Sequence, residues 1–362
     1  MDESINSYSV DSDSRCDNFA FVTYDDLPSF EWDDFISTCP GGWNTDRSEW
    51  MKFFTHDCGY RNYSFAIVAG GKIRMAFPLF MVPNLFLGKR LISGPFFDHG
   101  GPIIDPRWEH LIVPAQKNIA NLASRLNVRY VEIRDPIVPI PESLSRQSYC
   151  KFLLSLRKPE ENLYASLGNN VRRALKKANK ACSASVSNDP KDFIVVWNLY
   201  RRTMQIHGTP PWGMKFRRMF ETELELGRAH LVLARCKGAC LGGALVWGDG
   251  SSARLEIAAS PSEEARKLQV NSLLFWKAIV LTNSLGYERI DLTRTLKGSS
   301  HYNFKKRWGG TECPLPFTYL RHGTAPSDPR ESSLRLLAVI GKYVPSRVTF
   351  LLGDMIRIRL AM

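Results

Sequence analysis

Several signatures of common enzyme classes are missing from this sequence of 362 residues. It has no G-x-G-x-x-G, no phosphate-binding loop of the G-x-x-x-x-G-K-[ST] type and no G-x-S-x-G. Dinucleotide, kinase-like and serine-hydrolase chemistry therefore lack their usual motifs. The seven histidines form no H-E-x-x-H or comparable cluster, so no metal site is expected.

Closely spaced cysteine pairs are also missing. The eight cysteines are scattered along the chain, and no two have C-x-x-C spacing. In a reducing compartment, such cysteines are expected to be free, buried thiols. This prediction covers Cys16, Cys39, Cys58, Cys150, Cys182, Cys236, Cys240 and Cys313.

Long hydrophobic runs are absent as well. The longest uncharged apolar stretch, residues 75–88, is interrupted by Pro78 and Pro83, whereas a membrane-spanning helix needs about 20 apolar residues. Residues 1–17 are acidic and serine-rich without an apolar core, unlike a secretory signal. We therefore expect a cytoplasmic protein, with peripheral contact at the inner face of an anionic membrane as a further option.

Charge is plentiful but unevenly distributed. The net charge is +12, yet residues 1–70 hold 13 acids and 4 bases, which leaves 23 acids and 44 bases in the remainder. A basic body of this kind predicts a polyanionic partner, namely nucleic acid, anionic lipid head groups or a phosphorylated substrate. The length itself favours two domains.

Hydrophobic periodicity predicts the same order of elements in both halves of the chain. In the C-terminal half, the pattern predicts helices at 160–181, from 190, at 214–226, 264–285 and 300–308, and strands at 230–235, 240–247, 253–258, 289–292 and 316–320. In the N-terminal half, it predicts helices at 28–38, 46–57 and 107–126, a hairpin at 64–80 and a strand at 129–134. We interpret the halves as two related α/β domains.

The predicted boundaries follow from this order. A disordered acidic segment covers residues 1–18, and the two domains cover 19–150 and 151–322. Residues 323–362 form a linker followed by a basic, amphipathic helical tail, which either packs across the domains or lies on an anionic membrane.

Four stretches of the sequence carry recognisable motifs: Ser93–Phe97 with Gly100 and Gly101, Asn170–Lys180, Thr203–Pro210, and Asp291–Arg294 with Tyr302–Gly309. In this order they resemble the FemABX-like aminoacyl- and acyltransferases of the GNAT superfamily, in particular the FemAB-related proteins of polysaccharide and cell-envelope gene clusters. The resemblance runs from about Phe19 to the C-terminus. It implies two tandem GNAT-like domains, the first on the acceptor side and the second carrying the acyltransferase.

The sequence departs from this family pattern at three places. Ile206 stands where the muropeptide transferases have an arginine, and the tyrosine-rich strand is replaced by Arg254–Ser260. The glycine-rich pyrophosphate loop of ordinary GNAT proteins is missing from Ala265–Asn271. Because glycine-rich loops expose backbone N–H groups to phosphate, this absence favours aminoacyl-tRNA over acyl-CoA as the donor.

Acyl transfer to an amine requires proton removal, stabilisation of the carbonyl oxygen and alignment of the substrates. The resemblance implies that Lys305 stabilises the developing charge and that Arg294 helps to hold a phosphate or an oxyanion. The alternative for Lys305 is a solvated basic helix face. Tyr302 is a candidate for orienting the acceptor, with core packing as the alternative.

Glu256 is the candidate base. Strand alternation places it on one face with Arg254 and opposite Leu255 and Ile257. A salt bridge with a neighbouring basic residue is the competing interpretation. Asp291 is a second candidate base, for which capping of the following loop is the alternative.

The remaining candidates are substrate-binding residues. Arg172, Arg173 and Lys176 belong to a helix with five positive side chains in nine residues, which suits the phosphates of a tRNA acceptor arm. A solvated amphipathic face explains the same pattern. Thr209 and Trp308 complete the set, and Trp308 is equally suited to a core position.

The sequence thus predicts an acyltransferase that moves an aminoacyl or acyl group to an amine of a small-molecule, glycan or peptide precursor of the cell envelope, an exopolysaccharide or a natural product. No tightly bound cofactor is expected, and aminoacyl-tRNA or acyl-CoA serves as co-substrate. The alternatives are an acyl-CoA-dependent N-acyltransferase and a catalytically degenerate protein that binds polyanions or acts as a scaffold.

Overall fold

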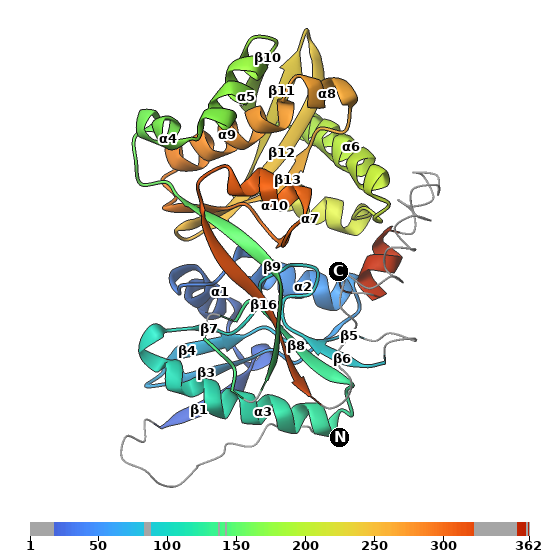
Figure 1. The fold of residues 1–362 in the computed structure, drawn as a ribbon. Coiled ribbons are helices and arrows are strands. Elements are labelled where there is room, and N and C mark those ends of the chain that lie inside the picture. Colours follow the sequence, from blue (N-terminus) through green and yellow to red (C-terminus); the bar gives the residue numbers. More distant parts are fainter. Residues whose placement is uncertain are drawn as a thin grey trace. The chain divides into compact units, whose positions relative to one another are not determined.

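The computed structural model describes residues 18–82, 88–136, 138–141, 143–321, 353–359 and 361. The predicted acidic segment and most of the predicted tail lie outside these residues. Contacts divide the chain into two compact units (Figure 1). The first comprises Met1–Gln147, Leu315–Pro326 and Ile358–Met362, and the second comprises Ser148–Pro314 and Ser327–Arg357.

The first unit is an α/β structure with two groups of strands. In one sheet, the strands are antiparallel and have the order β1-β3-β4-β7. The second group of strands has the order β16-β8-β6-β5-β2, and within it β6 and β8 are parallel. The strands are β1 (Phe19–Thr23), β2 (Arg61–Asn62), β3 (Phe65–Ala69), β4 (Lys72–Phe77), β5 (Phe80–Val82), β6 (Arg90–Ile92), β7 (Ile103–Ile104), β8 (Tyr130–Arg134) and β16 (Thr311–Arg321). The helices are η1 (Tyr24–Asp26), α1 (Ser29–Thr38), η2 (Asn44–Asp46), α2 (Ser48–Lys52), η3 (Phe53–Asp57), η4 (Pro106–Leu111) and α3 (Ile112–Arg125).

The amphipathic helix α3 closes the core of the first unit. Its apolar face carries Ile112, Ile119 and Leu122, which pack with Ile67 and Val131 of the strands. Spacing of three and four residues puts these side chains on one side of the helix. The predicted helix 46–57 is instead α2 followed by the π-helical turn η3, and the helix predicted from 107 begins as the 3₁₀ segment η4.

The second unit is built on a sheet with the order β10-β11-β12-β13-β14-β9. Its strands are β9 (Leu144–Ser155), β10 (Cys182–Ser187), β11 (Ala229–Cys236), β12 (Ala239–Asp249), β13 (Ser252–Ala259), β14 (Arg289–Asp291) and β15 (Thr295–Leu296). Its helices are α4 (Glu160–Ser166), α5 (Asn169–Asn179), α6 (Pro190–His207), α7 (Met214–Glu225), α8 (Glu263–Lys267), α9 (Val270–Ser284) and α10 (Ser300–Lys306).

Helices cover both faces of this sheet (Figure 1). Val246 of β12 packs in a cluster with residues of α5 and α9. The next residue, Trp247, stacks on Phe220 of α7 at 5.0 Å, and Phe220 in turn contacts Trp197 of α6. Side chains of successive strand residues point to opposite faces, so α5 and α9 lie on one side of the sheet and α6 and α7 on the other.

The parallel pairing of β13 with β14 is short. It joins only Ser252–Arg254 to Arg289–Asp291, although β13 continues to Ala259. The chain leaves β14 at Asp291 and enters a loop at this point. Charged side chains of β13 therefore meet the end of β14 where the two strands part.

Two helices that the sequence predicts as continuous are broken in the structure. The segment 160–181 divides into α4 and α5 because Gly168 is extended and acts as the N-cap of α5. The segment 264–285 divides into α8 and α9 at Gln269, whose φ is +62°. Apolar periodicity continues across both breaks, so it gave no sign of them.

The prediction that all the cysteines are free thiols is wrong for one pair. Cys182 and Cys236 form a disulfide between β10 and β11. The antiparallel register places these two residues directly opposite each other. They are 54 residues apart in sequence, so their proximity comes from strand pairing, which cysteine spacing does not reveal. Cys39, Cys58, Cys150, Cys240 and Cys313 form no disulfide among the described residues, and only Cys58 and Cys150 of these are buried as predicted. Cys16 lies outside the described residues.

Among the described helices, none has both the length and the apolar character needed to cross a membrane.

Replacing both Cys182 and Cys236 by serine should lower the free energy of unfolding by about 4 kcal/mol, because the disulfide restricts the unfolded chain over a long loop. Urea denaturation of the oxidised protein measures this difference. A control variant with serine at Cys240 and Cys313 should retain the stabilisation. If the urea midpoint of the wild-type protein is the same with and without a reductant, the disulfide is contradicted.

Candidate active site

Arg254, Glu256 and Asp291 form a buried ion-pair cluster where β13 and β14 part. Arg254 Nε donates to Glu256 Oε2 at 2.7 Å, and Arg254 Nη1 donates to Asp291 Oδ2 at 3.4 Å. The three side chains are only 4%, 8% and 2% exposed. Since a buried charge is costly unless it is paired, these contacts offset the cost of burying the guanidinium and the two carboxylates.

The loop after Asp291 has a strained backbone. Thr293, a β-branched residue, has φ of +68°, a conformation that costs of order 1–3 kcal/mol. The carboxylate of Asp291 holds it by accepting the Thr293 N–H at 2.7 Å. Capping of this loop, given above as the alternative role of Asp291, is therefore observed.

Lys305 of α10 is buried and holds the same loop from the other side. Its Nζ donates to the carbonyl oxygen of Thr293 at 3.1 Å, to Thr293 Oγ1 at 3.1 Å and to the carbonyl oxygen of Arg294 at 3.3 Å. The residue is 8% exposed, so it does not lie on a solvated helix face. The three acceptors named here all belong to the loop that follows Asp291.

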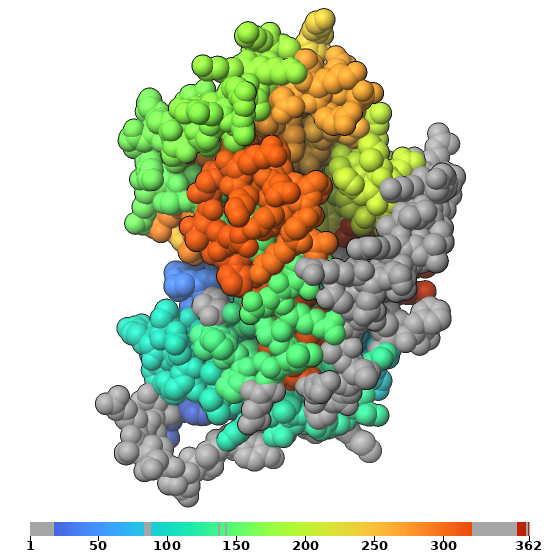
Figure 2. All heavy atoms as spheres, in the orientation of Figure 1, coloured from blue at the N-terminus to red at the C-terminus, as the bar shows by residue number. Residues whose placement is uncertain are grey.

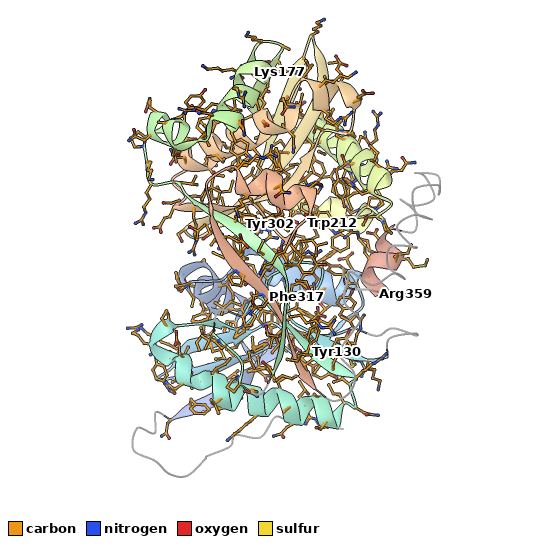
Figure 3. The ribbon with its side chains drawn as sticks, viewed as in Figure 1. Tyr130, Lys177, Trp212, Tyr302, Phe317 and Arg359 are labelled. Atoms are coloured by element: carbon orange, nitrogen blue, oxygen red, sulfur yellow. A yellow bond between two sulfur atoms is a disulfide. The ribbon has the colours of Figure 1, made fainter. Side chains whose placement is uncertain are left out.

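Arg294 and Tyr302 both precede this lysine in the sequence. The guanidinium of Arg294 stacks over the ring of Tyr149 at 5.2 Å, and the residue is exposed. Tyr302, labelled on α10 in Figure 3, donates its hydroxyl hydrogen to Glu312 Oε2 at 2.7 Å. This hydrogen bond, followed by desolvation, raises the pKa of Tyr302.

The other two predicted contacts have different environments. Thr209 is exposed, and its N–H bonds to the carbonyl of Met204 just beyond the end of α6. Trp308 is 3% exposed and packs against Phe275 and Phe304. The structure thus places Trp308 in the hydrophobic core of the second unit.

A histidine that the sequence analysis missed lies close to Lys305. His301 is at the start of α10, and its ring centroid is 5.9 Å from that of His207 at the end of α6. Burial lowers the pKa of His301, with further lowering by the Lys305 ammonium and by His207. A neutral imidazole is therefore favoured near neutral pH, and such a group can accept a proton.

The predicted basic helix borders a groove of about 900 Å³. Arg172, Arg173 and Lys176 of α5 line it together with Arg307, which follows α10. In the space-filling view, the green atoms of α4 and α5 adjoin the orange-red atoms around α10 (Figure 2). No ion pair joins any of these four cations to a carboxylate in the described part of the chain.

The structure thus brings the predicted residues together in two groups. Glu256, Asp291, Arg294 and Lys305 gather around the loop after β14, while Arg172, Arg173 and Lys176 line the groove. Arg254, which connects both candidate bases, was not among the predicted site residues. Its place two residues before Glu256 in a strand was the available signal, because that spacing puts both side chains on one face.

Comparison with known proteins identifies a matching domain family and similar folds. A family described as an acetyltransferase (GNAT) domain matches residues 165–306. The solved structure of FemX is similar with a TM-score of 0.63 at 16% identity, over 81% of this chain and 96% of FemX. L-PGS from Bacillus licheniformis is similar with a TM-score of 0.51 at 11% identity, over 87% of this chain and 99% of that chain. No curated protein matches the sequence.

Residues 165–306 thus match a GNAT acetyltransferase domain, and the chain has the α/β fold seen in FemX. The predictions of family and of fold class are therefore confirmed. The matched segment contains both groups of candidate residues.

Replacing Lys305 by methionine should raise the pKa of His301 toward its ordinary value, because a nearby cation disfavours the imidazolium. Titration of the His301 ring signals by NMR measures the change. Lys306→Met is the matched control, since Lys306 instead contacts Tyr302. An unchanged His301 pKa in Lys305→Met would place the Lys305 ammonium too far from His301 to act on it.

Proposed function

We propose that this protein transfers an aminoacyl group from aminoacyl-tRNA to an amine of a cell-envelope, exopolysaccharide or natural-product precursor. The observation that carries the choice of donor is the groove beside the candidate active site, which is lined by four cations that form no ion pair with the described residues. An anion that binds between like-charged side chains offsets their mutual repulsion, and the phosphates of a nucleic acid supply a row of such anions. Arg307 lies two residues after Lys305, so the groove and the candidate active site share α10 and its end.

The start of α9 supports the same donor. The residue just before α9 is Gln269, which has a positive φ and is not a glycine. The first residue of α9, Val270, is fully buried. The connection from β13 also carries α8, whose first turn holds Glu263 and Glu264. Carboxylates and bulky side chains replace the exposed glycine amides that would bind a pyrophosphate. Tight binding of coenzyme A has little support here.

The proposed chemistry uses the two groups of candidate residues as follows. The acceptor amine gives a proton to Glu256, the candidate base, and attacks the carbonyl carbon of the donor ester. A C–N bond forms, the ester C–O bond breaks, and the departing hydroxyl oxygen of the donor takes up the proton that Glu256 accepted. Lys305 and Arg294 place positive charge where the carbonyl oxygen becomes negative. Arg254 keeps Glu256 ionised before the reaction, and His301 is a second group able to accept the proton.

The first unit is proposed to hold the acceptor. It contains a groove of about 970 Å³ between α1 and β4. Residues of both charges line this groove, among them Asp34, Arg74 and Arg107, and Phe30 at its edge is 71% exposed. An exposed aromatic ring beside mixed charges suits a polar acceptor such as a glycan or a peptide precursor.

Two other functions have their own support. The match to a GNAT acetyltransferase domain favours acyl-CoA as donor, and the absence of a glycine-rich loop favours a non-catalytic, polyanion-binding protein. Binding of charged tRNA compared with binding of labelled acetyl-CoA distinguishes the two donors. A mass-spectrometric search for an acylated product in cell extract distinguishes an enzyme from a scaffold.

Replacing Lys305 by methionine should lower the transfer rate by about 100- to 1,000-fold, the range found when one charge-stabilising donor is lost. Single-turnover kinetics with charged tRNA measures the rate. Lys306→Met, a change of the neighbouring exposed lysine, should retain most activity. Circular dichroism must show that both variants are folded, and a folded Lys305→Met variant with a normal rate would refute the assignment.

Replacing Arg172, Arg173 and Lys176 by glutamine should weaken tRNA binding for all sequences alike and reduce the slope of log affinity against log salt by about 2–3. Filter binding at several salt concentrations measures both quantities. The matched control replaces Lys191, Arg202 and Arg218, which are exposed on the helices of the opposite sheet face. Equal losses in the two triple variants would show that net charge matters and the groove does not.

A further inference from the structure

The last two residues of a short helix at 353–359 are bound by the first unit through their carbonyl groups. The carbonyl oxygen of Ile358 accepts the hydroxyl hydrogen of Tyr60. The carbonyl oxygen of Arg359, labelled in Figure 3, accepts a guanidinium N–H of Arg90 at 3.0 Å. Carbonyl groups in the last turn of a helix have no partner within the helix. Tyr60 and Arg90, which are both buried, supply donors for them.

Ala361 connects the same segment to the loop of residues 93–101. Its carbonyl oxygen accepts two hydrogen bonds, one from the N–H of Phe96 at 3.2 Å and one from Arg134 Nη2 at 2.9 Å. The same guanidinium donates through Nη1 to the carbonyl oxygen of Phe97 at 2.7 Å. Arg134 thus binds the loop and Ala361 at once, and both residues are buried.

The hydrogen bond between the loop and Ala361 joins two strained residues. Phe96 has φ of +73° and Ala361 has φ of +55°, a conformation that is unfavourable for any residue with a side chain. Strained backbone persists only where other interactions hold it. Because Phe96 donates its N–H to Ala361, each of the two residues helps to hold the other in its strained conformation.

The rest of the loop is folded tightly on itself. A Cβ atom at Gly94 would lie 2.0 Å from the carbonyl oxygen of His99, so the loop doubles back at this glycine. The ring of Phe97 stacks on that of His99 at 5.7 Å. His99 is buried, and its Nε2 lies 2.6 Å from Thr45 Oγ1 of η2. A change of backbone conformation at Phe96 is therefore transmitted to His99.

We propose that the segment containing Ile358, Arg359 and Ala361 is an intramolecular latch on the loop of residues 93–101. While the latch is docked, the loop keeps its strained conformation; when the latch is released, the loop relaxes and His99 separates from Thr45. The latch does not depend on the proposed function, because no donor or acceptor takes part in it.

Opposing contributions make the docking of the latch reversible. The strain at Phe96 and Ala361 opposes docking. The hydrogen bonds to the three carbonyl groups favour docking, but each by a modest net amount, because it replaces a hydrogen bond to water. Docked and released conformations are therefore both accessible, and a substitution that changes the strain shifts the balance between them.

Hydrogen exchange at the Phe96 amide, measured by NMR on the full chain, reports whether the latch is docked. Ala361→Val should raise the exchange rate at least about tenfold, because a β-branched residue is strongly disfavoured at positive φ. Ala361→Gly should lower the rate about fivefold, because glycine adopts this conformation without a steric cost. Tyr60→Phe keeps the ring that stacks on Phe96 but removes the donor to Ile358, and it should also raise the rate.

The ring signals of His99 measure the response of the loop in the same samples. In Ala361→Val they should shift toward those of an exposed imidazole, and in Ala361→Gly they should stay as in the wild type. Met355→Ala is the matched control, because it changes an exposed side chain of the same short helix and leaves the three carbonyl groups in place. It should alter neither the Phe96 exchange rate nor the His99 signals.

Four results would overturn the latch. They are unchanged exchange at Phe96 in Ala361→Val, faster exchange in Ala361→Gly, unchanged His99 signals where Phe96 exchanges faster, and an equal rise in exchange at the amides of β3. The last result would make the segment an ordinary part of the core of the first unit. Transfer activity is not measured at any step, so a failure of the proposed function leaves this test unaffected.

Discussion

The buried guanidinium of Arg254 is the charge on which the candidate active site depends. It pairs with Glu256 on its own strand and with Asp291 on the neighbouring strand. Removal of Arg254 would leave two carboxylates buried without their cation, which typically costs 3–5 kcal/mol. The pairing also needs the short parallel contact of β13 with β14, because only that contact puts Arg254 opposite Asp291.

The strained loop is the next part of the same arrangement. Asp291 is bound on one side by Arg254 and on the other by the N–H of Thr293. Lys305 then binds the carbonyl oxygens of Thr293 and Arg294. A strained backbone conformation persists only where several interactions hold it. Here the Asp291 carboxylate and the Lys305 ammonium both hold Thr293. A carboxylate, an ammonium and the loop are therefore held in fixed relation before any substrate binds.

The sequence predicts those features that depend on neighbouring residues. The hairpin of β11 and β12, the amphipathic α5 and the alternation that pairs Arg254 with Glu256 follow from periods of 2 and 3.6 residues. Features that depend on distant residues were not predicted. The disulfide needs the register of β10 with β11, and α7 is capped by the side chain of Asp354. The breaks at Gly168 and Gln269 occur within continuous apolar patterns.

The same distinction explains why candidate site residues are easier to select from the sequence than a donor. Lys305 and Asp291 lie in one short motif, so a local resemblance suffices to select them. The donor depends on which surface carries phosphate-binding groups, and two local signals give different answers. The GNAT domain match favours coenzyme A, but α9 begins at the buried Val270 and lacks exposed glycine amides. The cations that line the groove are proposed above as another phosphate-binding surface. Because a long polyanion needs many separated contacts and a pyrophosphate needs one compact cradle, this distribution of charge fits a nucleic-acid donor better.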